Sequence, residues 1–226
     1  MSVIDHAVPV RRSPLAQWHR RRGAHFVATG EWPATYGDLQ RERRAAREFA
    51  ALLDAGPFDR FSLAVPRLAP APPGPPFRLG ELTVGSIEGR RAELWGLTDD
   101  ASLLVVPASD ARSASALASA LERDGLEATD VSSLYAALRL TGPAVRAVLE
   151  EIFPVDLSER ALPDRAIAFG PLAHVTVAVA RTDLGDLPSF TVLVARDHAE
   201  YIWDALLHVG EPHGLESVGA AALMED

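Results

Sequence analysis

Two pairs of carboxylates are the first groups whose spacing could do chemistry. Asp99 and Asp100 are adjacent, and Asp183 and Asp186 lie close together in "RTDLGDLP". Neighbouring carboxyl groups can act as general acid and general base when their surroundings separate their pKa values. The first pair falls in a predicted hairpin turn, where aspartate usually serves the backbone geometry. The second pair lies in a loop and could serve a turn or contact a ligand.

Gly142 lies at a predicted strand-to-helix junction, in "LRLTGPAV". A glycine there can let backbone N–H groups approach a phosphate. The chain has no Gly-x-Gly-x-x-Gly pattern and no lysine, so both the dinucleotide fingerprint and the P-loop are missing. We therefore expect a tightly packed connection at Gly142, with Pro143 at the first helical position.

The other reactive side chains give no recognisable pattern. Cysteine is absent, which excludes disulfides and thiolate ligands. The seven histidines are scattered, without the helical pairs that bind metals, so we predict no metal site. His174 falls in a predicted alternating strand, where a structural histidine is favoured over a ligand. A Gly-x-Ser-x-Gly nucleophile motif is absent, and we assign no catalytic residue.

The charge distribution bears on possible partners. The chain carries a formal net charge of −9, which argues against nucleic acid as its main partner. Residues 1–50 nevertheless hold nine arginines against five acidic residues, so this basic segment could dock on an acidic surface. No apolar run approaches the length of a membrane span, and the N-terminus lacks the apolar core of a signal peptide. We expect a cytoplasmic protein without a membrane partner.

The first third of the chain predicts two helices and a strand. The first helix covers 13–23, with Ser13 as its N-cap and Pro14 at the first helical position. The second covers 39–54, with an apolar stripe that includes Phe49. A strand follows over 58–66. Five prolines in 67–80 then exclude a helix or a central strand. We divide the chain into an N-terminal segment 1–66 that packs on the main domain, a proline-rich connection 67–80 and an α+β domain 81–226.

Strands adjoin in pairs from residue 81 onward, and helices follow them. The predicted strands cover 81–87, 90–98, 102–108, 132–140, 172–182 and 189–195. The predicted helices cover 109–125, 143–153 and 197–210, the last with a capping box of Asp197 and Glu200. This order favours an α+β fold, with antiparallel or mixed sheets and packed helices, over a doubly wound fold.

Five stretches in collinear order resemble the aminomethyltransferase family, which includes the T-protein of glycine cleavage and its folate-binding relatives. They are "SPLAQWHRRRGAHFVATGEWPATYGD", "RERRAAREFAALLDAGPFDRF", "DDASLLVVPAS", "DVSSLYAALRLTGPAVRAVLEEIFPVDLS" and "AEYIWDALLHVGEPHGLESVG". The resemblance covers 13–66 and about 92–220. It implies a folate-binding aminomethyltransferase-like domain, with tetrahydrofolate as the cofactor.

The departures from the family pattern concern the groups that do chemistry. The family's Asn-x-x-Gly-Gly-x-x-Asp-Asp strand, which carries its catalytic acid, has no match in 81–100. The family's Arg-Thr-Gly-Tyr-Thr-Gly-Glu loop appears as "RTDLGDLPSF", in which Arg181 and Thr182 match. The glutamate that would hold the pterin does not match, and Asp186 is one methylene shorter. The chain also stops at Asp226, where the family continues into a C-terminal barrel.

Such a shortened chain is similar to the gamma subunit of heterotetrameric sarcosine oxidase. That resemblance implies a structural subunit of an amine-demethylating or one-carbon transfer complex. Its partners would be flavoprotein or folate-binding chains, and one of them could hold the folate.

Two alternatives stay open. The first is a free-standing tetrahydrofolate-dependent aminomethyl or methyl transferase. It would bind folate beside the "RTDLGDLP" loop, through Arg181, Asp183, Asp186 and Tyr135. The second is a non-catalytic ligand-binding or regulatory module on the same fold.

Overall fold

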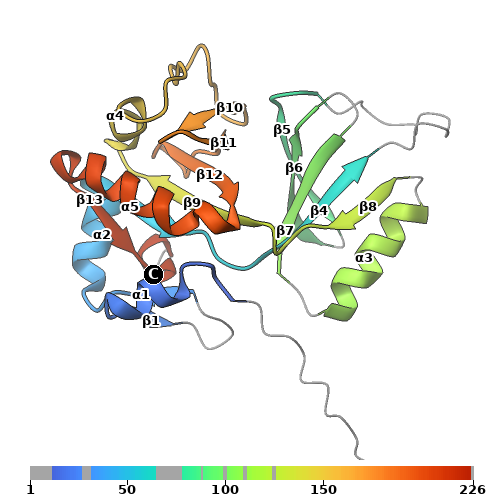
Figure 1. Ribbon diagram of the computed structural model, residues 1–226, viewed down its shortest axis with the longest axis horizontal. Coiled ribbons are helices and arrows are strands. Elements are labelled where there is room, and N and C mark those ends of the chain that lie inside the picture. The colour runs from blue at the N-terminus through green and yellow to red at the C-terminus, as the bar shows by residue number, and fades with distance from the viewer. Residues whose placement is uncertain are drawn as a thin grey trace, which may run out of the picture.

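Two β-sheets form the centre of the computed structural model and meet through a shared hydrophobic cluster (Figure 1). The structure describes residues 12–26, 32–64, 78–87, 89–98, 101–108, 111–123 and 126–224. Helices cover the outer sides of both sheets, so the layers run helices, larger sheet, smaller sheet, helix.

The larger sheet has six strands, and its neighbours are antiparallel except for one parallel pair at an edge. In spatial order the strands are β10 (Ile167–Leu172), β11 (Val175–Arg181), β12 (Ser189–Ala195), β9 (Tyr135–Thr141), β3 (Ala50–Asp54) and β13 (Leu215–Val218). The parallel pair is β3 with β13. Strands β12 and β9 pair over their full lengths, which makes them the rigid centre of this sheet.

The smaller sheet has five antiparallel strands. In spatial order they are β5 (Leu82–Ile87), β6 (Arg90–Gly96), β7 (Ala101–Pro107), β4 (Phe58–Ala64) and β8 (Glu127–Asp130). A separate ribbon pairs β1 (His25–Phe26) with β2 (Pro33–Thr35).

The N-terminal third of the chain contributes a strand to the interior of each sheet. Strand β3 lies between β9 and β13, and strand β4 lies between β7 and β8. The buried carboxylate of Glu42 also accepts hydrogen bonds from the backbone N–H groups of Tyr36 and Gly219, at 2.7 Å each. Strands β3 and β4 are thus integral to the two sheets, a closer association than the packing that the sequence predicts for 1–66. Most of the proline-rich stretch 67–80 lies outside the described residues.

The helices cover the two outer sides of the layers, except for one that packs on the other face of β3 against Ala51 and Leu53. They are α1 (Ala16–Arg21), α2 (Leu39–Glu48), α3 (Ala111–Arg123), α4 (Val145–Glu150) and α5 (Ala199–Gly210), with 3₁₀ turns at Arg196–His198, Glu211–His213 and Ala220–Leu223. Helices α1, α4 and α5 share one core with the larger sheet. Helix α3 packs on the outer side of the smaller sheet through Leu117.

Alternation along the strands decides which layer each side chain enters. On β9, Leu138 and Leu140 join the core beneath the helices, whereas Ala137 joins the cluster between the sheets. Strand β11 divides in the same way, because Val179 faces the helices and Ala180 faces the smaller sheet. The period of two places Arg139 on the side of β9 that faces the smaller sheet.

The prediction of one long helix over 39–54 is wrong. Helix α2 ends at Glu48, Phe49 leaves helical geometry with φ −133° and ψ −110°, and Ala50–Asp54 forms strand β3. All five residues of β3 are buried. Pairing on both edges of an interior strand outweighs the helix preference of alanine and leucine. Phe49, placed on the apolar stripe by the sequence, is 42% exposed.

Two predicted helix caps are also wrong. Helix α1 begins at Ala16 with Leu15 as its N-cap, although Ser13 Oγ accepts a hydrogen bond from the Leu15 N–H at 2.9 Å. A 3₁₀ turn precedes α5, whose N-cap, His198, makes no side-chain cap. The Asp197 carboxylate contacts His198 Nδ1 at 2.9 Å, so the predicted capping box does not form.

The predicted strand over 172–182 is a hairpin end followed by a strand. Leu172 closes β10, and Ala173 and His174 turn the chain with φ of 47° and 69°. His174 is therefore a turn residue. Strands β1, β2, β8, β10 and β13 were not predicted from the sequence, because they are short or lack clear alternation. Helix α4 lies within the predicted helix 143–153, and its Val145, Val148 and Leu149 are fully buried.

Candidate functional site

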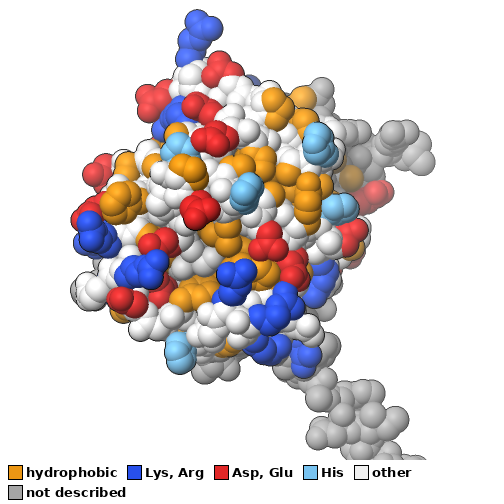
Figure 2. Space-filling view, turned by 60° about the vertical axis from the view of Figure 1, so that its left-hand side comes forward, with side chains coloured by type: hydrophobic (Ala, Val, Ile, Leu, Met, Phe, Trp, Pro, Cys, Tyr) orange, Lys and Arg blue, Asp and Glu red, His pale blue; other side chains and the backbone are white. Residues whose placement is uncertain are grey.

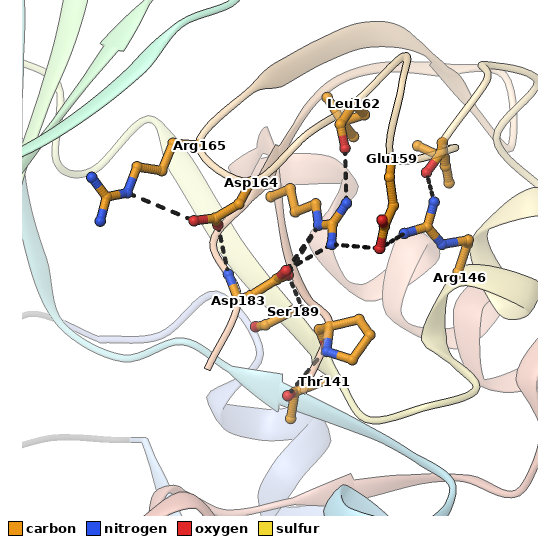
Figure 3. Close-up of polar contacts among 11 residues, drawn as sticks. Thr141, Arg146, Glu159, Leu162, Asp164, Arg165, Asp183 and Ser189 are labelled. Atoms are coloured by element: carbon orange, nitrogen blue, oxygen red, sulfur yellow. Dashed lines mark hydrogen bonds and ion pairs between the residues drawn. The ribbon is translucent and has the colours of Figure 1, made fainter. Parts of the chain in front are cut away.

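Arg181 and Asp183, two residues that the sequence proposed as ligand contacts, bind each other (Figure 3). Arg181 Nε donates to Asp183 Oδ1 at 3.0 Å and to Oδ2 at 3.1 Å, and Nη2 donates to Oδ2 at 2.7 Å. Arg181 Nη1 donates to the Leu162 carbonyl at 3.1 Å. The Ser189 N–H donates to Asp183 Oδ1 at 3.1 Å. Each guanidinium nitrogen and both carboxylate oxygens are thus engaged within the protein.

A second arginine extends this cluster toward the surface. Glu159 lies 3.5 Å from Arg181 Nη2 and 4.0 Å from Arg146 Nη2, and Arg146 Nη1 donates to the Leu157 carbonyl. The Glu159 side chain is 80% exposed, so its ion pairs contribute little to stability. The Arg181–Asp183 pair is better shielded, since the two side chains are 7% and 21% exposed.

The loop before β10 closes the cluster from the other side. Asp164 Oδ1 accepts a hydrogen bond from the Asp183 N–H at 3.0 Å, and Asp164 Oδ2 lies 3.7 Å from Arg165 Nε (Figure 3). The cluster therefore ties the 157–165 segment to the end of β11. Its geometry is that of a structural clasp.

The electrostatics fit a salt bridge within the fold. The hydrogen bond to Asp183 raises the pKa of Arg181. Burial acts to raise the pKa of Asp183, but hydrogen bonds from Arg181 and the Ser189 N–H outweigh it, and the pKa lies below its ordinary value. Both groups stay charged at neutral pH, and neither is poised for proton transfer.

Asp186 does not join this pair. Leu184 and Leu187 exchange two backbone hydrogen bonds, of 2.9 and 3.1 Å, and this tight turn holds Gly185 and an exposed Asp186 at its tip. Gly185 has φ of 64°, a conformation that glycine adopts at little cost. Asp186 thus occupies a turn position, in keeping with the frequency of aspartate in turns.

Tyr135 lies at the opposite end of the larger sheet. It pairs with Ala195, whereas Thr141, six residues along β9, pairs with Ser189 beside the Arg181 cluster. Six strand steps amount to about 20 Å. The four predicted contacts therefore do not form one site.

A large cavity adjoins Tyr135. Its volume is about 870 Å³, and it lies between the start of α1, the start of β9 and the end of β12. Arg12, Arg20 and Arg196 line it together with Leu134, whose side chain is 58% exposed. This cavity is positively charged and partly apolar, and the sequence pattern gave no sign of it.

A second polar centre joins α1 to β3, and sequence reasoning missed it. The Ser13 hydroxyl donates to Asp54 Oδ2, and His19 Nε2 lies 3.2 Å from the same oxygen. The Tyr36 hydroxyl lies 2.6 Å from His19 Nδ1. Burial raises the pKa of Tyr36, and the charges of Asp54 and Glu42 raise it further. Tyr36 therefore stays protonated and donates to Nδ1, which leaves the Nε2 proton to donate to Asp54.

This Ser13–Asp54–His19–Tyr36 centre is not a nucleophile arrangement. A catalytic serine needs the histidine beside its hydroxyl, with the carboxylate behind the histidine. Here the carboxylate lies between Ser13 and His19. The centre is a buried structural tie between two segments that the sequence placed on separate helices.

Gly142 packs tightly, as the sequence predicted. Its φ is 123°, and a Cβ at this position would lie 2.6 Å from the Phe49 carbonyl oxygen and 2.9 Å from that of Ala46. Asp99 and Asp100 lie outside the described residues. Within the described ranges no group of three or more His, Asp or Glu side chains could hold a metal ion. In the same ranges no helix is long and apolar enough to cross a membrane.

Comparison with known proteins gives the chain its relatives. The family model of the GCVT N-terminal domain matches residues 94–225, which is more than half of the chain. An aminomethyltransferase of Desulforamulus reducens is 26% identical over 94% of this chain and 62% of its own length. One of Deinococcus deserti is 29% identical over 91% of this chain and 62% of its own length. The chain thus spans about three fifths of these relatives.

Two solved structures share the fold. The glycine cleavage system aminomethyltransferase T of Bartonella henselae superimposes with a TM-score of 0.73 at 20% identity, over 95% of this chain and 61% of that one. A chain of the heterotetrameric sarcosine oxidase of Corynebacterium sp. U-96 superimposes with a TM-score of 0.63 at 22% identity, over 91% of this chain and 97% of that one. The family match and the shared fold place this chain in the GCVT N-terminal domain family, as an aminomethyltransferase-like protein.

Proposed function

We propose that this chain is a structural subunit of a complex that demethylates amines or transfers one-carbon units linked to tetrahydrofolate. The observation that carries the proposal is the closed Arg181–Asp183 clasp. Arg181 and Asp183, which the resemblance indicated as ligand contacts, instead bind each other and stabilise the fold. A scaffold that keeps the family fold while its polar loop is internally satisfied fits an architectural role.

The poor fit of the four predicted contact residues to tetrahydrofolate supports the same conclusion. Arg181 and Asp183 bind each other, Asp186 lies exposed on a turn, and Tyr135 is about 20 Å away along β9. The cavity beside the Thr182–Leu184 segment measures about 220 Å³, below the roughly 300–1,000 Å³ of typical cofactor sites. These residues do not make a folate site together. In the proposed complex, folate is bound by a partner chain.

The surface offers places for a partner to dock. On the side of the molecule that carries α2, α4 and α5, hydrophobic side chains gather across the middle of the face, with charged side chains of both signs around them (Figure 2). Phe49, Phe169 and Tyr201 are 42%, 41% and 53% exposed. Apolar anchors within a charged surround are typical of subunit interfaces.

The test is purification of the tagged chain from its own cells, under gentle conditions. We expect a complex of fixed stoichiometry that carries flavin absorbance and oxidises an N-methyl amine such as sarcosine. Light scattering gives the mass of the complex, and mass spectrometry identifies its chains. A monomer that by itself binds tetrahydrofolate and turns over an aminomethyl donor would overturn the proposal.

The Tyr135 cavity favours one alternative, a free-standing tetrahydrofolate-dependent transferase. Its volume of about 870 Å³ lies within the range of cofactor sites, and its arginines would attract the carboxylates of a folate tail. If the isolated chain binds folate, Tyr135→Ala and Arg196→Gln should weaken binding by about tenfold. Asp186→Ala, on the exposed turn, is the matched control and should leave the affinity unchanged. Equal affinities in all four proteins would remove this alternative.

A further inference from the structure

A small polar cavity lies between the two sheets, on the side of the larger sheet that faces away from the helices. It measures about 220 Å³. Its walls come from β6 and β7 of the smaller sheet and from β9 and the segment after β11 of the larger sheet. Its polar lining residues are Arg91, Glu93, Arg139 and Thr182.

Arg139 is the unusual member of this lining. It occupies the position on β9 where the period of two points into the layer between the sheets, next to Ala137 of the shared hydrophobic cluster. Its Nε donates to Thr191 Oγ1 at 3.3 Å. Among the described residues it forms no ion pair within 4.0 Å. The residue is half-buried, and Glu93 lines the same cavity without forming an ion pair with it. A partly desolvated charge that lacks a close acidic partner is costly for a protein to keep.

Thr182 gives a second, independent sign of a missing ligand. The residue is 5% exposed and lines the same cavity. Its Oγ1 is buried and has no hydrogen-bond partner among the described residues. Buried hydroxyl groups are usually bonded. The oxygens of Ser102 and Ser189 also lack a partner among the described residues, but only the Thr182 hydroxyl belongs to a residue that lines this cavity with Arg139.

The charged side chains that line the cavity favour a ligand with one negative charge. Arg91 and Arg139 oppose one carboxylate, that of Glu93, so the lining carries one net positive charge. The oxygens of Glu93 already accept hydrogen bonds from Arg91 Nη2 at 3.3 Å and from Trp95 Nε1 at 3.2 Å. Arg139 and Thr182 therefore remain as the donors for an incoming anion.

We propose that this inter-sheet cavity is a carboxylate-binding site. The carboxylate accepts hydrogen bonds from the two Nη groups of Arg139, and one of its oxygens also accepts from the Thr182 hydroxyl. A planar guanidinium matches a planar carboxylate with two donors, which favours this anion over a spherical one. A water molecule takes about 30 Å³ of liquid volume, so the cavity has room for a carboxylate with a few carbon atoms. The inference does not depend on the function proposed above.

Thermal unfolding of the whole chain with added sodium acetate tests the site. A ligand that binds only the folded state raises Tm, and at ten times its Kd the rise should be about 4 °C for a chain of this size. Sodium chloride at the same ionic strength is the reference and should give no comparable rise. The N-acyl glutamate half of folate, p-aminobenzoylglutamate, is the second probe. Acetate alone indicates a free small acid, whereas binding of both probes in competition indicates the carboxylate end of a larger ligand.

Two variants locate the binding. Arg139→Leu removes the charge and should weaken acetate binding by at least about 100-fold, so its Tm should not respond. Thr182→Val keeps the shape, removes one donor and should weaken binding by about fivefold. Arg165→Gln removes a surface arginine and should respond like the wild type. If Arg139→Leu fails to fold, Thr182→Val and titration calorimetry of the wild type decide the matter. A rise in Tm that chloride matches, a rise that persists in Arg139→Leu, or no heat of binding with either probe would each overturn the proposal.

Discussion

Arg181 and Arg139 are two arginines of the same sheet in opposite circumstances. Arg181 closes β11 on the helix side, and all three of its guanidinium nitrogens have acceptors within the protein. Arg139 lies inside β9 on the side of the smaller sheet, and only its Nε has a partner among the described residues. The pKa of Arg181 is raised by its hydrogen bond to Asp183, whereas burial lowers the pKa of Arg139.

The difference shows that burial alone does not tell what a charged side chain does. Arg181 has an acid two residues away on the same loop, so the chain itself supplies its counterion. Among the described residues Arg139 forms no ion pair, although Glu93 lines the same cavity, and the Thr182 hydroxyl has no hydrogen-bond partner there either. The mutually bonded pair of Arg181 and Asp183 indicates a structural role, whereas the unbonded groups of Arg139 and Thr182 indicate a binding site. Stability measurements can separate the two roles, because removing Arg181 should lower the free energy of unfolding and removing Arg139 should raise it.

The largest effect is expected on removing the satisfied arginine. Arg181→Met leaves the half-buried Asp183 carboxylate with only backbone donors, and the loss of three charge-assisted hydrogen bonds should cost about 3 kcal/mol. Urea unfolding at neutral pH measures the change. Arg165→Gln is the control, because its side chain is 63% exposed and its loss should stay within about 0.5 kcal/mol. Equal losses in the two variants would show that the clasp adds nothing.

The next effect is the pH dependence that the same clasp creates. The pKa of Asp183 is lower in the folded protein than in the unfolded chain, so its stabilisation is complete above the unfolded value of about 3.9. It is lost as pH falls through the folded value. Asp183→Asn should cost about 2 kcal/mol at neutral pH, and the gap to wild type should narrow below about pH 4. Asp186→Asn, from the exposed turn, should run parallel to wild type throughout. A gap for Asp183→Asn that stays constant with pH would contradict this origin.

Much of the fold was predictable because local patterns agreed with it. The strands predicted over 132–140 and 189–195 and the helix predicted over 143–153 correspond to β9, β12 and α4, and the collinear stretches indicated the family. Strand β3 was not predictable from its own residues. Its alanines and leucines favour a helix, and only pairing with β9 and β13, distant in the chain, makes them a strand. Local propensity gives way to tertiary pairing there.

The candidate site was harder to predict for a related reason. The resemblance indicated the "RTDLGDLP" loop as a ligand site, but the sequence could not show that Arg181 and Asp183 form a salt bridge with each other. The Ser13–Asp54 contact joins residues 41 positions apart and was hidden by the helix assigned to Asp54. Arg139 had one readable signal, a charge at an inward position of an otherwise apolar strand.

A smaller effect of opposite sign is expected for the unsatisfied arginine. Arg139→Leu replaces a desolvated charge with an apolar side chain in the layer between the sheets. Without a carboxylate in the buffer, this should raise the free energy of unfolding by about 1 kcal/mol. Urea unfolding of wild type, Arg139→Leu and Arg181→Met in one buffer gives the comparison directly. A loss in Arg139→Leu as large as that in Arg181→Met would mean that both arginines are structural.

The smallest effect concerns two neighbouring threonines, one paired and one unpaired. Thr182→Val removes a buried hydroxyl that has no partner among the described residues, and it should be neutral or stabilising by up to about 0.5 kcal/mol. Thr191→Val removes the acceptor of Arg139 Nε and should cost about 1 kcal/mol, since a buried donor loses its only partner. Both exchanges preserve shape, so the difference isolates the hydroxyl. The same measurement is then repeated with acetate. If Thr182→Val now has a lower free energy of unfolding than wild type, the Thr182 hydroxyl donates a hydrogen bond to the bound acetate.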